Sequence, residues 1–135
     1  MGALMISLDV NHPDVEEFID CKTDLSRVNY ANISVRVNDS FMKAVENDKD
    51  YILRWPCGAD LDIDPEACAE YNKLYSNELS GNTLYWKKVK AREIFKKLVK
   101  NNWNYAEPGI LYWDKITGYN LVANDPNFEY AGVNP

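Results

Sequence analysis

The chain has 135 residues, of which 46% are hydrophobic and 27% are charged. This composition is typical of a globular domain with a buried core and excludes a disordered chain. Cys21, Cys57 and Cys68 are widely spaced and form no Cys-x-x-Cys pair, so they predict neither a disulfide framework nor a zinc site. The apolar run Leu4–Leu8 is far too short to cross a membrane, so we expect a cytoplasmic protein without a membrane partner.

The net charge of −6 is unevenly distributed along the chain. Residues 87–100 carry a net charge of +6, which leaves −12 for the remainder. Basic strips also occur in nucleic-acid-binding proteins, but the acidic remainder would repel a polyanion. We therefore interpret the strip as the solvated face of a helix and expect no nucleic-acid partner.

The first third of the chain predicts a βαβ unit. Ala3–Leu8 is a continuous apolar run, which is typical of a strand covered on both faces. Asn11–Asp14 predicts the start of a helix with a proline at an early helical position, and Val15, Phe18 and Ile19 would be its buried face. Asn32–Val37 alternates apolar and polar residues, as a second strand does.

The rest of the chain predicts further alternation of helices and strands. Asn38–Ser40 caps a short helix that ends near Asn47, and Asp50–Trp55 predicts a brief strand. The longest predicted helix runs from Leu84 to Asn102, and Ile110–Trp113 predicts another strand. The remaining predictions are a helix from Pro65 to Ser76, a loop over 115–129 and a strand at Tyr130–Val133. Together these elements predict one α/β domain over residues 1–135.

Two groups of residues have the composition of functional sites. Asp60, Asp62 and Asp64 begin like a calcium loop, but Pro65 replaces the required glycine and Tyr71 the bidentate glutamate, so a helix-capping loop is the better interpretation. Trp86, Trp103 and Trp113 could stack on bases, although at these positions they are predicted to fill a core or an inter-domain face.

His12 is the only histidine, so no histidine pair for a metal is present and no nucleophile–base pair can be argued from spacing. A role at the start of the helix is the better interpretation of His12. The sequence therefore predicts no metal site and no complete set of catalytic residues.

Several runs resemble the large subunit of ribonucleotide reductase, in particular its adenosylcobalamin-dependent class. The most specific are Gly2–Cys21 with Lys22, the strand Ala31–Val37, the run Ala91–Phe95 followed by Glu107–Gly109, and the terminal Gly132–Pro135. The resemblance implies that the chain is part of the first half of a ten-stranded α/β barrel.

The resemblance also implies where the chemistry lies. In that family the Asn-Pro pair is followed by Cys-Gly-Glu, whose cysteine becomes the thiyl radical. Asn134 is accordingly expected to hydrogen-bond the ribose hydroxyls, and Gly2 and Ala3 to belong to the loop that relays effector identity to the substrate base. The radical cysteine is expected just after Pro135, so no catalytic residue is expected within the chain, which would be inactive alone.

The implied parent converts ribonucleotides to 2′-deoxyribonucleotides for DNA replication, with adenosylcobalamin as cofactor. The fragment itself is expected to bind no cofactor. The implied partners are the ribonucleotide substrate, a deoxynucleoside triphosphate as allosteric effector and the remainder of the barrel, and unpaired strand edges predict self-association of the isolated fragment. The alternative is a free-standing acidic interaction module that reuses this fold segment.

Overall fold

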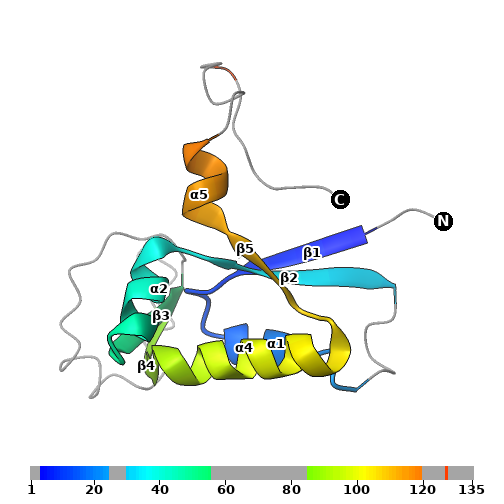
Figure 1. Cartoon of the computed structure of the whole chain (residues 1–135), viewed down its shortest axis with the longest axis horizontal. Coiled ribbons are helices and arrows are strands. Elements are labelled where there is room, and N and C mark those ends of the chain that lie inside the picture. Colours follow the sequence, from blue (N-terminus) through cyan, green and yellow to red (C-terminus); the bar gives the residue numbers. More distant parts are fainter. Residues whose placement is uncertain (1–3, 25–29, 56–84, 120–126, 128–135) are drawn as a thin grey trace.

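The computed structural model describes residues 4–24, 30–55, 85–119 and 127, which form a mixed α/β structure (Figure 1). β1, β2 and β5 form a parallel sheet in the order β1-β2-β5, and β3 and β4 form an antiparallel pair. No helix among these residues has both the length and the apolar character needed to cross a bilayer. The elements are β1 (Leu4–Asp9), α1 (Val15–Asp20), β2 (Ala31–Val37), α2 (Asp39–Glu46), β3 (Asp50–Trp55), β4 (Tyr85–Lys90), α4 (Ala91–Tyr105), β5 (Gly109–Tyr112) and α5 (Trp113–Gly118).

The hydrophobic core lies between the parallel sheet and the helices α1 and α4, which lie together on one side of it (Figure 1). Alternate residues of β2 point to this side, because side chains of a strand alternate between its two faces. Val15 and Ile19 of α1 meet the sheet there, as the sequence predicts. The core residues are Val10, Val15, Ile19, Val35, Val37, Phe41, Ala44, Leu53, Ala91, Ile94 and Leu98.

The predicted βαβ unit is confirmed, with two corrections in detail. β1 and β2 are adjacent and parallel, with Leu4 opposite Ala31. α1 begins at Val15, so Pro13 precedes the helix instead of lying in its first turn. Leu4 and Ile6 are 55% and 42% exposed, so the expectation that both faces of β1 are covered is wrong for the described part of the chain.

The predicted helix from Leu84 to Asn102 is wrong over its first third. Residues 85–90 form the strand β4, which pairs antiparallel with β3, and α4 begins only at Ala91. Lys88 and Lys90 form ion pairs with Asp50, the first residue of β3, at 3.8 and 2.7 Å. Pairing with a distant strand therefore overrides the local helical pattern of the lysine-rich run.

The strand predicted at Ile110–Trp113 is shifted by one residue, and it leads directly into an unpredicted helix. β5 ends at Tyr112, and α5 occupies the start of the segment predicted as a loop. The Asp114 carboxylate of α5 accepts a hydrogen bond of 2.7 Å from the backbone N–H of Asp39, at the start of α2. This contact anchors the first turn of α5 to another element. The predicted helix 65–76, the strand 130–133 and the acidic run 60–71 lie outside the described residues.

Gly109 is required by the close approach of β5 to β2. A Cβ atom at this position would lie 2.9 Å from the hydroxyl oxygen of Ser34, its register partner. At this distance the Ser34 side chain or the two strands would have to move. The serine side chain is too short to swing away without moving its backbone as well. A Cβ atom added at Gly118, in contrast, would have nothing within 4 Å.

We predict that Gly109→Ala lowers the free energy of unfolding by roughly 1–3 kcal/mol, because of the collision with Ser34. Ser34→Ala in the same chain removes the oxygen and should restore part of that loss. Urea unfolding of the single and double variants measures both effects. Gly118→Ala is the matched control and should leave stability unchanged or slightly raised. An additive double variant would show that the contact between the two residues is not the cause.

Candidate functional site

The face of the parallel sheet opposite α1 and α4 is unusually polar. Parallel strands are usually apolar on both faces. In β2, however, every second residue is polar, and the residues of β1 that lie opposite these polar residues include a serine and an aspartate. We call this surface the polar face. Its polar members are Ser7, Asp9, Asn32, Ser34 and Arg36, and Met5, Gly109 and Leu111 lie among them by register. A polar surface on a parallel sheet is the first candidate for function.

The amino end of the sheet is held by a partly buried ion pair. Lys22, which follows α1, pairs with the carboxylate of Glu107, and their side chains are only 15% and 20% exposed. Glu107 also accepts a hydrogen bond of 3.4 Å from the backbone N–H of Ile33 in β2. One carboxylate thus joins the end of α1, the start of β2 and the approach to β5.

The carboxyl end of the sheet is organised by Asn11, which is 7% exposed. Its side-chain oxygen accepts hydrogen bonds from Asn38 Nδ2, at 3.2 Å, and from the Tyr51 hydroxyl. Its backbone carbonyl accepts a 2.7 Å hydrogen bond from the N–H of Arg54, and its N–H donates to Asp9 Oδ1 at 2.8 Å. Every polar group of a buried residue needs a partner, and Asn11 uses its partners to join β1, α2 and β3.

Sequence reasoning missed this network. Asn38 is recognisable as the N-cap of α2, and it does accept the Phe41 N–H at 2.7 Å. The second role of its amide, as a donor to Asn11, depends on a long-range contact that has no spacing signal.

Of the three tryptophans named in the sequence analysis, Trp103 and Trp113 have described side chains, and the environments of these two side chains differ. The guanidinium of Arg36 lies 4.9 Å from the ring centroid of Trp113, a cation–π contact at the carboxyl end of the polar face. Trp103 is 88% exposed, so it does not fill the core of the described part, and its expected alternative place at an inter-domain face stays a prediction. It lies with Phe95 and Val99 beside an apolar hollow of about 400 Å³ on α4.

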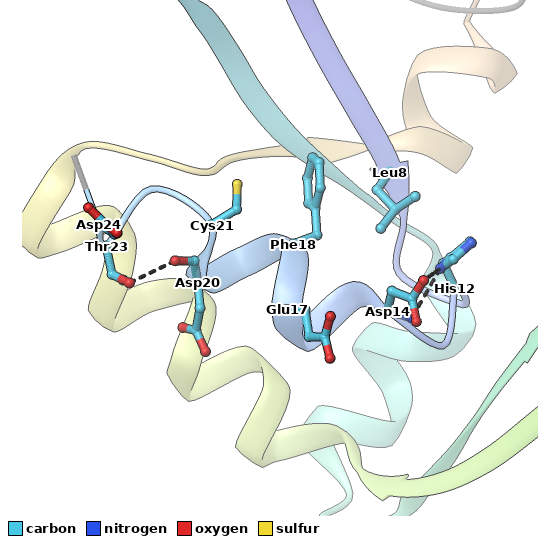
Figure 2. Close-up of a pocket in the computed structure, with 9 residues that line it drawn as sticks. All are labelled: Leu8, His12, Asp14, Glu17, Phe18, Asp20, Cys21, Thr23 and Asp24. Atoms are coloured by element: carbon cyan, nitrogen blue, oxygen red, sulfur yellow. Dashed lines mark hydrogen bonds and ion pairs between the residues drawn. The ribbon is translucent and has the colours of Figure 1, made fainter. Parts of the chain in front are cut away.

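A second candidate is a hollow of about 800 Å³ beside α1 (Figure 2). Leu8 and Phe18 give it an apolar part, and its other lining residues are mostly acidic. His12 lies at one end, where its Nδ1 accepts a 3.0 Å hydrogen bond from the N–H of Asp14, as a residue at the start of a helix does. The remaining lining residues are Asp14, Glu17, Asp20, Cys21, Thr23 and Asp24. None of the described residues forms a group of carboxylates, thiols and imidazoles that could hold a metal ion.

Asp20, at one side of this hollow, has a structural role. Burial raises its pKa, but hydrogen bonds from Lys97 and Asn101 and the positive charge of Lys97 outweigh that effect, so the pKa is lowered. The two contacts are 2.7 Å and 3.0 Å long, and Asn101 also donates to the carbonyl of Ile19. An ionised carboxylate held in this way joins α1 to α4 and is a poor proton donor or acceptor near neutral pH.

The residues to which the sequence assigns function fall outside the described residues. Asn134 lies in the segment 128–135, and Gly2 and Ala3 precede β1.

Comparison with known proteins decides the family. The family model for the barrel domain of ribonucleotide reductase matches residues 1–126. The chain belongs to the ribonucleotide reductase family.

Relatives of this chain include enzymes described as vitamin B12-dependent. The ribonucleotide reductase of Streptomyces avermitilis is 30% identical across 99% of the chain, and the ribonucleoside-diphosphate reductase of Thermoplasma acidophilum is 34% identical across 95%. The large subunit of the ribonucleoside-diphosphate reductase of Caenorhabditis elegans, whose description mentions no B12, is 30% identical across 84%. The chain spans 14% of the length of the first two relatives and 15% of the third.

We predict that Tyr51→Phe destabilises the protein by about 1–2 kcal/mol at neutral pH, since Asn11 loses a buried donor. The ring should stay in place, because it packs edge-on against Phe41 with centroids 5.2 Å apart. Urea unfolding measures the difference. Tyr119→Phe, at a site 87% exposed, is the control and should have no effect.

The same tyrosine predicts a dependence of stability on pH. Burial raises the pKa of Tyr51 from 10.0 to about 12. The unfolded chain therefore releases this proton at lower pH than the folded chain, so the contribution of Tyr51 is complete below pH 10 and is lost by about pH 12. The stability advantage of wild type over Tyr51→Phe should shrink across this window. A constant difference between the two proteins would contradict the assignment.

Proposed function

We propose that the chain is a segment of the catalytic barrel of a B12-dependent ribonucleotide reductase, in the first half of the ten-stranded barrel. The observation that carries the proposal is the match of the barrel-domain family model to residues 1–126. The parallel sheet with one apolar and one polar face supports it, since a barrel strand packs helices outside and presents its other face to the interior.

In this proposal the segment positions the substrate, and the radical chemistry is supplied by other parts of the parent chain. The Asn134 amide hydrogen-bonds the ribose hydroxyls, because it offers a donor and an acceptor without adding a proton source. Gly2 and Ala3 form the end of the effector-relay loop. A thiyl radical takes the 3′ hydrogen and later returns it to the sugar, the 2′ hydroxyl is protonated and leaves as water, and a cysteine pair supplies two electrons and two protons as it becomes a disulfide. Cys21, Cys57 and Cys68 match none of these family cysteines.

The residues of the described part do not fit adenosylcobalamin. The larger hollow is rimmed by four carboxylates, which would repel the phosphodiester of the cofactor's nucleotide loop. The only imidazole, that of His12, already has its Nδ1 engaged by the Asp14 N–H. We therefore place the cofactor of the parent enzyme on other parts of the protein and derive no step through it.

The proposal also assigns a partner to the exposed apolar surfaces. β1 and β5 are the outer strands of the described sheet, and strand edges pair readily with further strands. Val99 and Trp103 on α4 are 47% and 88% exposed beside the apolar hollow. We assign these surfaces to contacts with the remainder of the reductase barrel. The isolated chain should accordingly be inactive and prone to self-association.

We predict that Asn134→Ala in the full-length reductase lowers kcat roughly 100-fold, because the ribose is no longer held for hydrogen removal. Effector affinity should stay near that of wild type, since the amide is assigned to the substrate alone. Steady-state turnover and equilibrium effector binding on the same preparation measure both quantities. Equal losses in the two would remove Asn134 from the substrate site.

A second test concerns the radical cysteine. Translation of the coding sequence beyond Pro135 should give Cys-Gly-Glu, and replacement of that cysteine by alanine should abolish reduction. A different continuation would leave the reductase reaction without its expected radical site and would support the alternative, an acidic interaction module.

A further inference from the structure

Helix α4 carries a second apolar row beside the one that it buries. Residues four positions apart lie on the same face of a helix, and the row with Ile94 and Leu98 is completely buried in the core. The neighbouring row consists of Phe95, Val99 and Trp103, and these side chains line the apolar hollow of about 400 Å³. Trp103 is 88% exposed and Val99 is 47% exposed. Exposed apolar side chains grouped around a hollow mark a contact surface, and tryptophan is a frequent anchor of such contacts.

The lysines beside this hollow differ from the other basic residues of the strip 87–100. The ion pairs of the strip join Lys87 to Glu16, Lys88 and Lys90 to Asp50, Arg92 to Asp48, and Lys97 to Asp20. Neither Lys96 nor Lys100 forms an ion pair with any residue that the structure describes, and both line the hollow. Within the strip, the positive charge that the described fold leaves unpaired therefore lies beside the exposed apolar row.

The hollow faces away from α1. Lys97 and Asn101 contact α1 through Asp20, and Val99 follows Lys97 by two residues, which places it about 200° around the helix. On that side α2 contacts the first turn of α4, where Arg92 donates to two carbonyls of α2. The later turns carry the hollow.

The position of α4 indicates what lies opposite the hollow in the parent. α4 leads into β5, which is an outer strand of the described sheet. In a parallel sheet covered by helices, the neighbour of an outer helix comes from the next unit of the sheet. The chain spans 14% of the length of two of its relatives, so in the proposed function most of the parent polypeptide lies outside it.

We propose that this face of α4 docks an acidic amphipathic helix of the parent polypeptide. The apolar row of that helix covers Val99 and Trp103, and carboxylates beside the row pair with the two lysines. Lys96 and Lys100 are four residues apart, so they lie about 6 Å apart along the helix axis. Carboxylates at positions i and i+4 of the partner helix have the matching spacing. Charges at the rim of an apolar contact fix which partner is accepted and in what register.

This inference rests on the proposed function, which makes the chain a segment of a longer reductase, and adds the chemistry of the element that covers α4. A photo-crosslinker in the full-length reductase identifies that element. Benzoylphenylalanine takes the place of Trp103, and the irradiated protein is digested and mapped by mass spectrometry. We expect an intramolecular crosslink to a segment outside residues 1–135, with aspartate or glutamate within one helical turn of the attachment point. The same crosslinker at Asn104, which is exposed on α4 and lies about 100° around the helix, is the matched control and should not reach that segment.

Charge reversal in the full-length reductase tests the two lysines. Lys96→Glu together with Lys100→Glu should lower the apparent Tm by roughly 2 °C or more, because two attractions become repulsions. Reversal of the two nearest carboxylates of the crosslinked segment in the same chain should restore most of this loss. Lys43→Glu together with Lys49→Glu is the matched control, since these lysines are also exposed. The control should lower the apparent Tm less, and the reversed carboxylates should not rescue it.

A crosslink to a second copy, to another protein or to a segment without carboxylates would overturn the proposal, and so would the absence of any crosslink. A reversal of Lys96 and Lys100 that is no more harmful than the control, or that the second reversal does not rescue, would overturn it as well. Each of these results leaves the proposed function intact as long as the wild-type enzyme reduces ribonucleotides. A wild-type parent that reduces none would overturn the proposed function, whereas the crosslink would still report whether α4 is covered as we infer.

Discussion

The alternation of side chains along β2 is the constraint on which the rest of the structure depends. Ile33, Val35 and Val37 are almost completely buried, and the last two belong to the core shared with α1 and α4. The residues between them form the polar face. A shift of register by one residue would exchange the two sets, burying an arginine and exposing the core. Because β2 pairs with both β1 and β5, its register also fixes theirs.

The Asn11 network shows how a polar contact extends this order beyond the sheet. The antiparallel β3–β4 pair shares no strand with the parallel sheet. It is joined to that sheet by the Tyr51 hydroxyl and the Arg54 N–H, which both donate to Asn11. Burying an amide is costly unless its groups are hydrogen-bonded, and here each bond also specifies where a separate element lies. An apolar residue at this position would keep the backbone bond to Arg54 but would lose the two side-chain bonds that fix Tyr51 and Asn38.

The sequence predicted elements well where local pattern and tertiary environment agree. β2, β3 and the capped helix α2 have clear alternation or cap signals, and they lie within about a residue of their predicted bounds. Residues 85–90 show the opposite case, since their strand structure depends on pairing with β3. The partners of Asn11 could not be predicted either, because they come from elements that only the folded chain brings together. The predicted site residues Asn134, Gly2 and Ala3 lie outside the described residues, so their roles stay predictions.

The ion pair at the amino end of the sheet gives a physical reason for two motifs of the family resemblance. Lys22 follows the first motif and Glu107 begins Glu-Pro-Gly, yet the two side chains meet in a partly buried contact. Removing either partner would leave a charge in a half-buried site, which costs more than loss of an exposed pair. Since Glu107 also binds the N–H of Ile33, the contact holds the residue that follows Asn32. The same motif supplies Gly109, whose missing side chain lets β5 approach Ser34. Both motifs thus shape the amino end of the polar face.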